Sequence, residues 1–329
     1  MKKIIIVGLG SMGKRRLRLI KQISDEFEII GVDSNKSRIE EVEKQFGICC
    51  KECIEDALKE GDIQSAFVCT SPLSHHAIIK TLLENDLNVF TEINLVNEGY
   101  EELIDLAKQK HKVLFLSSTF LYRNDIHKIS EYVKNERVNY IYHTGQYLPD
   151  WHPWESFKDF FVSDVRTNGC REIMTIEFPW LIDCFGKISN ISVTGDDKLS
   201  KLELGYRDNY LLMIEHENGN KGIIAIDVVA RKARRTLEVY NENIQIFWDG
   251  TPQSLMIYDK EEKCLRAVKT YNSVEKDSRY TENIIENAYS DEIIAFLHQV
   301  ETGKTDKTRY SFEKDLYTLK WIDRIEYGE

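Results

Sequence analysis

A glycine-rich turn near the start of the chain constrains the fold more than any other part of this sequence. The stretch IIIVGLGSMGKRRLRLI places Gly8, Gly10 and Gly13 in GxGxxG spacing, after a β-branched run and before a segment of helical period. In a strand–turn–helix unit the first glycine permits a tight turn, the second lets the backbone approach a pyrophosphate, and the third allows close helix packing. The sequence therefore predicts the opening unit of a doubly wound parallel sheet.

An acid at the end of the second predicted strand indicates a dinucleotide ligand. Asp33 follows Gly13 by twenty residues, where its carboxylate can accept hydrogen bonds from a ribose diol. Because a carboxylate repels a 2′-phosphate, we predict NAD as the cofactor and NADP as the less favoured one, with Lys36 and Arg38 leaving NADP open. The structural alternative is a glycine turn that only packs a helix and binds no nucleotide.

The pattern of strands and helices divides the chain into two domains. From Lys3 to Asp125, β-branched runs alternate with amphipathic stretches, as in a parallel sheet covered by helices. The expected strands are KIIIVG, FEIIGVD, SAFVCT, NVFTE and KVLFLSS, and the expected helices include SHHAIIKTLLEND and NEGYEELIDLAKQK, the latter with Asn97 as N-cap. Later come the strand VNYIYHTGQY, hairpins at Asn218-Gly219 and in RTLEVYNENIQIFWD, and two closing helices, SDEIIAFLHQVETG and SFEKDLYTLKWIDRIEY, each with a Ser at its start.

Charge and hydropathy exclude two classes of partner. The chain has 44 Lys plus Arg against 55 Asp plus Glu, and its net charge of -11 repels a nucleic-acid backbone. The basic tract KRRLR is interpreted as the solvated face of the first helix. No apolar run reaches the roughly 20 residues that cross a bilayer, and MKKIIIVGLG breaks at glycine too early for a signal peptide. We therefore expect a cytoplasmic protein without nucleic-acid or membrane partners.

The cysteines predict neither disulfides nor a metal site. There are seven, an odd number in a chain without an evident secretion signal, which favours reduced thiols. CCKEC contains a CxxC spacing, Cys50 and Cys53, but no second pair or nearby His completes a tetrahedral zinc site. These thiols are interpreted as incidental.

Four segments together resemble the glucose-fructose oxidoreductase, inositol dehydrogenase and MocA (Gfo/Idh/MocA) family over nearly the whole chain. They are GLGSMGKRRLR, TSPLSHH, VFTE and the terminal YSDEIIAFLHQVETGKTDKTRYSFEKDLYTLKWIDRI. The resemblance implies an α/β protein with an N-terminal Rossmann doubly wound parallel sheet and a C-terminal α+β domain whose open, mostly antiparallel sheet often forms a dimer interface. We therefore expect a dinucleotide-binding domain in residues 1–122 and a substrate-binding and oligomerisation domain in residues 123–329. The C-terminal helices are free to pack back on the first domain.

The resemblance also implies a set of cofactor residues. A family pattern like TPxxxxH beside the nicotinamide is matched by Thr70, Ser71, Pro72 and His76, whereas His75 is the weaker candidate. The two histidines could instead be a helix-start pair partly exposed to water. The predicted cofactor-binding residues are Gly8, Gly10, Ser11, Met12, Gly13, Asp33, Thr70, Ser71, Pro72, His76 and Glu92.

Two proton-handling residues of the family pattern are missing. The family's Glu-Lys-Pro is Glu92-Ile93-Asn94 here, and isoleucine cannot tune a proton transfer. The segment NGCREIMTIEFPWLIDCFG contains no histidine, and the family's histidine position falls on Ile176 or Trp180. Glu92 is retained as a residue that orients the cofactor or its loop and as a secondary catalytic candidate.

Another group must therefore handle the proton. Glu177 is the leading catalytic candidate, because an acid in an apolar stretch has a raised pKa, with Arg171 and Glu172 as substrate or structural partners. The equally weighted alternative is that Glu177 is ion-paired within the fold, with Arg171 as one possible partner.

Further candidates flank the second domain. In DWHPWE, Trp151 and His152 are predicted to contact substrate, with His152 also a catalytic candidate, whereas Trp154 is expected to pin the loop. Tyr122 and Arg123 follow the fifth predicted strand, where open α/β sheets bind ligands, although Arg123 could equally brace the domain junction. The arginines of the RKARR stretch are expected on a solvated or interface face, with phosphate binding as the minority alternative: Arg231, Arg234 and Arg235.

These features predict an NAD(H)-dependent oxidoreductase acting on a secondary carbinol of a sugar, nucleotide sugar or cyclitol, as a homodimer or homotetramer. Two alternatives stay open. One is a non-catalytic dinucleotide or sugar-binding sensor or assembly partner. The other is a hidden-redox enzyme that holds NAD tightly and begins an elimination, epimerisation or hydrolysis by transient oxidation.

Overall fold

The computed structural model describes residues 2–152, 155–194, 198–276 and 284–328, and the statements below concern these residues. The chain forms two compact units. Unit 1 comprises Met1–Thr119 and Tyr289–Leu316, and unit 2 comprises Phe120–Ala288 and Tyr317–Glu329. The last two helices each contribute residues to both units.

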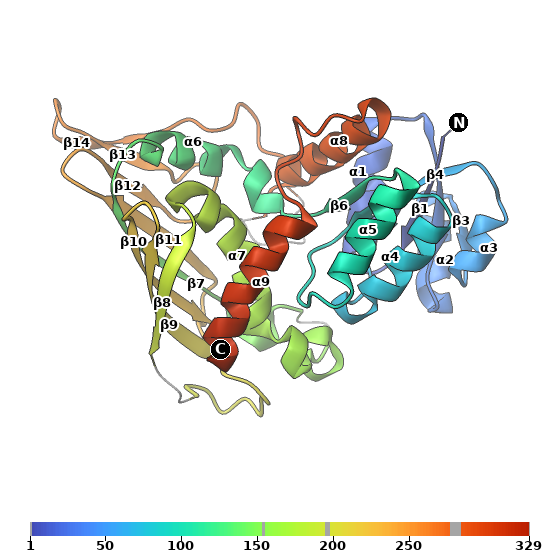
Figure 1. Ribbon diagram of the computed structural model, residues 1–329, viewed down its shortest axis with the longest axis horizontal. Coiled ribbons are helices and arrows are strands. Elements are labelled where there is room, and N and C mark those ends of the chain that lie inside the picture. The colour runs from blue at the N-terminus through green and yellow to red at the C-terminus, as the bar shows by residue number, and fades with distance from the viewer. Residues whose placement is uncertain (1, 153–154, 195–197, 277–283, 329) are drawn as a thin grey trace. The chain divides into compact units, whose positions relative to one another are not determined.

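Unit 1 is built on a six-stranded sheet in the order β3-β2-β1-β4-β5-β6, with every neighbouring pair parallel (Figure 1). This is the Rossmann strand order, whose switch point lies between β1 and β4. The strands are β1 Lys2–Val7, β2 Phe27–Val32, β3 Cys49–Lys51, β4 Ile63–Val68, β5 Asn88–Thr91 and β6 Leu114–Leu116. The helices are α1 Ser11–Ile23, α2 Lys36–Phe46, α3 Ile54–Leu58, α4 His75–Glu84, α5 Tyr100–Lys110 and most of α8 Glu286–Thr302.

The core of unit 1 follows from its apolar strands. One aromatic from each of β4, β5 and β6 stacks beside the next, and Phe296 of α8 packs edge-on against all three: Phe67, Phe90 and Phe115. The five predicted strands are confirmed. The short strand β3 escaped prediction because its three residues carry no alternating pattern. Asn97 as N-cap of α5 is wrong, because Gly99 precedes Tyr100 in a left-handed conformation.

Unit 2 is built on an eight-stranded sheet in the order β14-β13-β12-β11-β7-β10-β9-β8. Among the described strands of this second sheet, only the β7–β10 pair is parallel. The strands are β7 Asn139–Gly145, β8 Ile188–Thr194, β9 Asn209–His216, β10 Lys221–Asp227, β11 Arg234–Tyr240, β12 Gln245–Trp248, β13 Met256–Asp259 and β14 Cys264–Ala267. The helices are α6 Asn124–Val133, α7 Gly169–Phe185 and most of α9 Phe312–Tyr327.

The sheet of unit 2 has one buried and one exposed face. Helix α7 covers the buried face, where Tyr140 stacks on Phe185 and Tyr142 meets Trp180 edge-on. Both predicted hairpins are confirmed, β9–β10 through Asn218-Gly219 and β11–β12. Helix α9 begins after Ser311 as predicted, whereas α8 begins at Glu286, ahead of the predicted serine.

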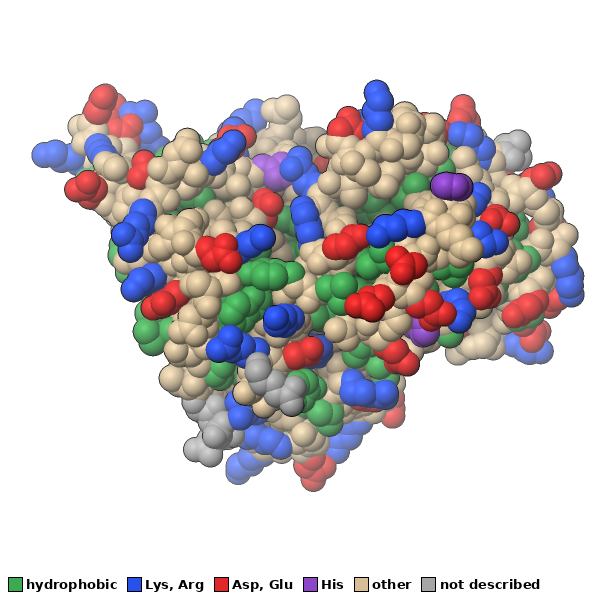
Figure 2. All heavy atoms as spheres, in the orientation of Figure 1, with side chains coloured by type: hydrophobic (Ala, Val, Ile, Leu, Met, Phe, Trp, Pro, Cys, Tyr) green, Lys and Arg blue, Asp and Glu red, His purple; other side chains and the backbone are tan. Residues whose placement is uncertain are grey.

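The predicted fold class is confirmed: a doubly wound parallel sheet is joined to an α+β unit with an open, mostly antiparallel sheet. No helix among the described residues is long and apolar enough to cross a membrane. On the face of the described chain seen in Figure 2, acidic and basic side chains are interspersed without a broad patch of either sign.

Candidate functional site

The glycine turn lies between β1 and α1, and its three glycines differ in what surrounds them. A Cβ on Gly8, whose φ is +91°, would lie 2.7 Å from the Cys69 carbonyl oxygen, and a Cβ on Gly13 would lie 1.8 Å from that of Gly8. A Cβ on Gly10 would meet no described atom within 4 Å. Packing therefore explains Gly8 and Gly13 but not Gly10. The open side of Gly10, at the N-terminus of α1, fits a pyrophosphate that must approach the backbone.

Asp33 lies directly after β2 with its carboxylate fixed by the backbone. Its Oδ2 accepts from the Leu9 amide at 2.8 Å and its Oδ1 from the Asn35 amide at 2.8 Å. These two bonds leave lone pairs for a ribose diol, because a carboxylate can accept about four. The half-exposed Arg38 has its Nη1 3.7 Å from Oδ2, so a cation lies beside the acid.

The loops after β4 and β5 are tied together by a buried histidine. Nδ1 of His75 lies 2.5 Å from Oδ1 of Asn94, and Nε2 lies 3.0 Å from the Thr70 carbonyl oxygen. Burial lowers the pKa of His75, which favours a neutral ring. The expectation that both histidines are partly exposed is therefore wrong for His75, which braces Thr70 against the residue that replaces the family's proline.

The remaining residues of this loop have local partners. The Ser74 hydroxyl contacts Thr70 Oγ1 at 2.8 Å, and Ser71 and Pro72 begin a 3₁₀ turn ahead of α4. His76 lies 3.0 Å from Glu102 of α5, and its ring occupies the space beside Gly99. Met12 accepts a weak contact from Arg15 at 3.2 Å. The cofactor roles of these residues and of Ser11 stay predictions.

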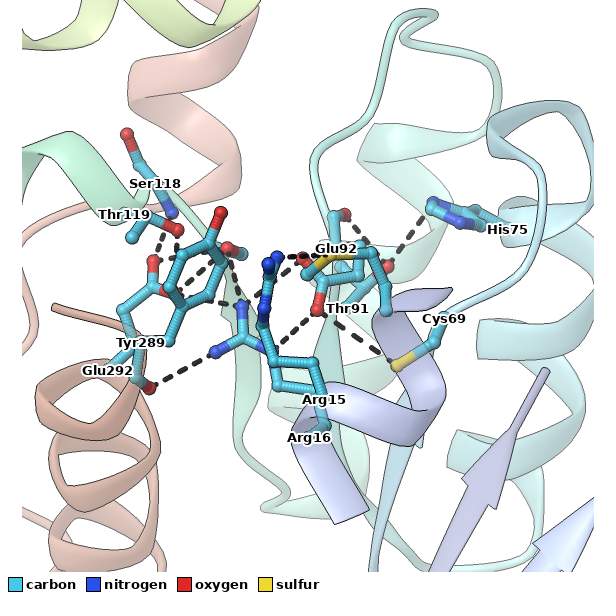
Figure 3. A network of polar contacts seen from close by, with 12 residues as sticks. Arg15, Arg16, Cys69, His75, Thr91, Glu92, Ser118, Thr119, Tyr289 and Glu292 are labelled. Atoms are coloured by element: carbon cyan, nitrogen blue, oxygen red, sulfur yellow. Dashed lines mark hydrogen bonds and ion pairs between the residues drawn. The ribbon is translucent and has the colours of Figure 1, made fainter. Parts of the chain in front are cut away.

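Glu92, directly after β5, is part of a buried ion network centred on Arg16 of α1 (Figure 3). Arg16 donates to Glu92 at 2.6 and 3.2 Å, to Glu292 at 2.9 Å, to the Ser117 hydroxyl at 3.2 Å and to the Tyr289 carbonyl at 3.2 Å. Its side chain has no exposure. Burial alone lowers the pKa of Arg16, but the charges of Glu92 and Glu292 outweigh it and raise the pKa.

The second acid of this network, Glu292 of α8, holds the segment after β6. It accepts from the hydroxyls of Ser117 and Thr119 and from the Ser118 amide, at 2.7–3.1 Å. Burial raises the pKa of Glu292, although Arg16 opposes the shift. One guanidinium thus joins α1, the ends of β5 and β6, and α8 within unit 1.

The interpretation of KRRLR as a solvated face is wrong. Arg16 is fully buried and Arg15 is nearly so, with its guanidinium 4.4 Å from the centre of the Tyr289 ring. A signal was available, because Gly13, Arg16, Leu17 and Ile20 form the i, i+3, i+4, i+7 stripe that faces a core. The acids that pair with Arg16 are distant in sequence, so the charge pattern near the tract did not reveal them.

The cation beside Glu92 therefore comes from α1 and not from the following residue. Ile93 is partly exposed, and Arg16 is enclosed and reaches no solvent. Cys69, after β4, has its sulfur 4.0 Å from Glu92, and burial raises the pKa of this thiol well above its usual value. This edge of the sheet can position a cofactor but offers no exposed acid or base at residue 93.

In unit 2, Glu177 is fully buried under the sheet. Arg235 donates to its Oε1 at 2.9 and 2.6 Å, and the Tyr142 hydroxyl and Trp180 indole donate to its Oε2 at 2.6 and 2.7 Å. The alternative that Glu177 is ion-paired within the fold therefore agrees with the structure, and its partner is Arg235 and not Arg171. The expectation that Arg235 lies on a solvated face is wrong, because its guanidinium bonds the buried carboxylate of Glu177. Four donors on one carboxylate favour a structural role.

Arg171 and Arg123 are also ion-paired. Arg171 bonds Glu326 and, at 2.7 Å, Asp323, both on α9. Arg123 bonds Asp125 at 2.9 and 2.5 Å and the Gly250 carbonyl at 2.7 Å, next to the buried Tyr122. These contacts account for both guanidinium groups, so we assign neither to a substrate.

The predicted aromatic loop lies near the start of α7. The Trp151 indole donates to the Gln146 carbonyl at 3.0 Å, and its ring approaches Gly169. His152 lies 2.6 Å from Glu155 and against Phe160. Trp154 lies outside the described residues. In the neighbouring loop, Arg231 stacks over Tyr147, with 3.7 Å from its guanidinium carbon to the ring centre.

Glu172, predicted as a substrate or structural partner, lies on α7 in an environment that the sequence did not indicate. Oε2 of Glu172 is shielded from solvent and has no hydrogen-bond partner among the described residues, and the likewise shielded hydroxyl of Tyr206 lies against the backbone of Gly169. Burial raises the pKa of Glu172 to about 8. The sequence could not reveal that Tyr206 lies near this helix, because Tyr206 is in an irregular segment with no pattern linking it to α7. Among the described residues, no group of three or more His, Cys, Asp or Glu side chains could hold a metal ion.

Comparisons with known proteins agree with this geometry. Residues 2–118 match the model of the "Oxidoreductase family, NAD-binding Rossmann fold", GFO_IDH_MocA. The mouse enzyme biliverdin reductase A is 26% identical over 225 residues, which cover 66% of this chain and 68% of that enzyme.

Solved structures of the same fold cover nearly the whole chain. UDP-N-acetylglucosamine 3-dehydrogenase from Acidithiobacillus ferrooxidans has a TM-score of 0.74 at 14% identity and covers 99% of this chain and 96% of its own. Levoglucosan dehydrogenase with NADH and L-sorbose has a TM-score of 0.78 at 14% identity, with 100% and 96% covered. The Rossmann segment, residues 2–118, thus matches the Gfo/Idh/MocA oxidoreductase family, and over the whole chain the likeness to the solved structures is one of fold.

The Arg16 network generates a prediction about stability. Arg16→Met leaves Glu92 and Glu292 buried without their cation, so we expect unfolding in urea to show a loss of about 3–5 kcal/mol. The two uncompensated acids should also acquire raised folded-state pKa values. An acid whose pKa is raised in the folded state stabilises that state at low pH, and this contribution disappears as the pH rises. The decrease in the free energy of unfolding caused by Arg16→Met should therefore be smaller at pH 5 than at pH 8.

Lys59→Met is the control for this prediction, because its ion pair with Asp56 is exposed. It should change stability by less than about 1 kcal/mol and without that pH dependence. A small, pH-independent effect of Arg16→Met would contradict the assignment of Arg16 as the charge that holds unit 1 together.

Proposed function

We propose that this protein is an NAD(H)-dependent oxidoreductase that moves hydride to or from a secondary carbinol of a sugar, nucleotide sugar or cyclitol. The observation that carries the cofactor assignment is the open side of Gly10 between two glycines that packing requires. Asp33, held by two backbone amides, supports NAD over NADP. When bound, the dinucleotide would supply the hydride acceptor or donor, with Gly8, Gly10, Gly13 and Asp33 holding its diphosphate and ribose.

The substrate class rests on relatives that share the fold. A dehydrogenase of UDP-N-acetylglucosamine and one of levoglucosan resemble this chain over nearly its full length. The relative biliverdin reductase A favours a second candidate function, in which the substrate is biliverdin and not a sugar, nucleotide sugar or cyclitol. Both candidates require a hydride and a proton, and Ile93 cannot supply the proton.

Substitutions in the glycine turn test the cofactor site. Gly10→Ala should leave the melting temperature unchanged, because its Cβ meets no described atom, but should weaken NADH binding about tenfold or more. Gly13→Ala should lower the melting temperature and also weaken NADH binding, since its Cβ overlaps the Gly8 carbonyl. Fluorescence titration with NADH and NADPH measures binding and cofactor preference. Wild-type affinity in Gly10→Ala would exclude this turn as the pyrophosphate site.

Turnover tests the reaction. We expect absorbance at the nicotinamide band to change when the protein and NAD(H) meet at least one of UDP-N-acetylglucosamine, levoglucosan or myo-inositol, and to stay constant with biliverdin. An absorbance change with biliverdin alone would favour the second candidate function, reduction of biliverdin. NADH binding without turnover would indicate a sensor, and copurified NAD that does not exchange would indicate hidden-redox chemistry.

We also propose that two copies associate through the exposed face of the unit 2 sheet. Ile141 of β7, Ile223 of β10 and Met213 of β9 lie side by side and are 44%, 53% and 59% exposed. Such an apolar row on a sheet face is typical of an interface.

A lysine in this row tests the interface. Ile223→Lys should convert an oligomer into monomers in light scattering after gel filtration. Leu199→Lys is the matched control, because Leu199 is exposed but belongs to no strand. A wild-type mass for Ile223→Lys would exclude this face.

A further inference from the structure

A buried row of polar groups in unit 1 links the loops after β4 and β5 to the start of α9. Nε2 of His75 lies 3.0 Å from the Thr70 carbonyl oxygen, and Nδ1 lies 2.5 Å from Oδ1 of Asn94. Burial and Asp315 raise the pKa of Tyr100, and the Asn94 amide opposes them by donating a hydrogen bond. The Tyr100 hydroxyl donates to Oδ2 of Asp315 at 2.5 Å. One relay is thus formed by Thr70, His75, Asn94, Tyr100 and Asp315, whose last four side chains are only 2–3% exposed.

The relay has four contacts but only three hydrogens to place in them. Its two ends, the Thr70 carbonyl and the Asp315 carboxylate, can only accept. Between them, a neutral His75 ring supplies one N–H and the Tyr100 hydroxyl supplies one O–H. The Asn94 amide presents its oxygen to one neighbour and its NH₂ to the other, so it supplies one hydrogen. One contact therefore lacks a hydrogen, whichever imidazole tautomer and amide orientation are assigned.

The nearest further hydroxyl does not supply the missing hydrogen. Oγ1 of Thr91 lies 3.3 Å from Nδ1 of His75 and 3.2 Å from the Glu92 carbonyl oxygen (Figure 3). Its hydrogen can point at either atom, but the contact between Nδ1 and Asn94 then still has none. Two buried acceptors that face one another are unfavourable, so the relay favours uptake of one proton from solvent.

The groups around His75 determine the pH at which this proton binds. Burial lowers the pKa of His75, whereas its two hydrogen bonds and the charge of Glu92 oppose the shift. Glu92 is itself paired with Arg16, and burial raises the pKa of Cys69, after β4, so that this thiol keeps its proton. On α5, Glu102 contacts other side chains of α4. Uptake is therefore expected on the acid side of an ordinary histidine.

We propose that the relay binds one proton reversibly and thereby positions the loops after β4 and β5. With the proton bound, His75 is an imidazolium that donates to both loops. The Asp315 carboxylate balances its charge through the two side chains between them. Without the proton, one of the four contacts opens. His75 acts as a positioning residue, because both of its nitrogens bond to the protein.

The consequence for cofactor binding rests on the proposed function. Ligands of open α/β sheets bind at the carboxyl ends of the strands, where both loops lie. A dinucleotide that requires both loops in place binds more tightly when the proton is bound, and by linkage its binding strengthens proton binding. NADH affinity should therefore rise as the pH falls.

Unit 2 contains a buried histidine whose contacts have all their hydrogens. Nδ1 of His216 lies 2.7 Å from the Gly186 carbonyl oxygen, and Nε2 lies 2.9 Å from the Tyr140 hydroxyl. One N–H and one O–H serve these two contacts, so the neutral ring satisfies both. Burial lowers the pKa of His216 as well. It is the matched control, because it shares burial with His75 but not the missing hydrogen.

Histidine NMR tests the relay without any ligand. In the full chain labelled with ¹⁵N-histidine, two-bond ¹H–¹⁵N spectra distinguish neutral rings from imidazolium, and His75→Gln assigns the signal. His75 should carry one ring hydrogen at about pH 8 and two at about pH 5.5, whereas His216 should carry one throughout. A His75 ring with a single hydrogen over this whole range would overturn the proposal.

A tyrosine substitution separates the missing hydrogen from burial. Tyr100→Phe removes the link to Asp315 and leaves two contacts for two hydrogens, so a neutral His75 ring satisfies both. Its proton uptake should disappear from this pH range, whereas Tyr140→Phe should leave it unchanged. The same His75 titration in Tyr100→Phe as in the wild type would overturn the relay. If Tyr100→Phe does not fold, the wild-type titrations of His75 and His216 decide.

Fluorescence titration with NADH tests the coupling to the cofactor. Affinity should rise about fivefold or more from about pH 8 to about pH 6 in the wild type and in Tyr140→Phe, and should stay constant in Tyr100→Phe. Equal pH dependence in all three proteins would overturn the positioning role. If His75 titrates as expected but NADH does not bind at any pH, the relay stands and the proposed function fails.

Discussion

The ion network around Arg16 is the interaction on which unit 1 depends. A guanidinium without exposure is stable only if its charge and its donors are satisfied, and here two acids, a hydroxyl and a carbonyl do so. The partners come from β5, β6 and α8, so the charge of one residue on α1 aligns the helix that begins at the glycine turn with the ends of two strands. The pyrophosphate turn and the loop at Glu92 therefore share one support.

This support changes the meaning of the missing lysine. In the family pattern a cation follows the glutamate, and here the glutamate takes its cation from α1. Arg16 keeps Glu92 paired but is enclosed, so it replaces the charge of the lysine and not its access to a substrate. The edge of the sheet keeps its electrostatic balance after losing a reactive group. Binding of a dinucleotide and proton transfer thereby become separable properties.

The sequence predicted the features that depend on local pattern. The glycine spacing, Asp33, the alternating strands and the Asn218-Gly219 turn each reflect neighbours along the chain. It failed where partners are distant: Arg16 with Glu292, and Glu177 with Arg235. Arg16 and Glu177 stand in segments whose composition gives no hint of an opposite charge nearby. Only the three-dimensional packing distinguishes a buried partner from a solvated side chain.

Glu172 and Glu177 show how helix geometry separates two acids with the same chemistry. They lie five residues apart, which rotates them well apart on a helix of 3.6 residues per turn. Glu177 points under the sheet, where four donors saturate its carboxylate, whereas Glu172 is partly exposed as a residue and has one shielded oxygen without a hydrogen-bond partner among the described residues. Burial raises the pKa of Glu172 to about 8, so both of its protonation states are populated near neutrality. An acid that is already fully bonded has no lone pair to spare for a substrate, so the contacts of Glu177 are those of a residue that holds α7 against β7 and β11 of unit 2.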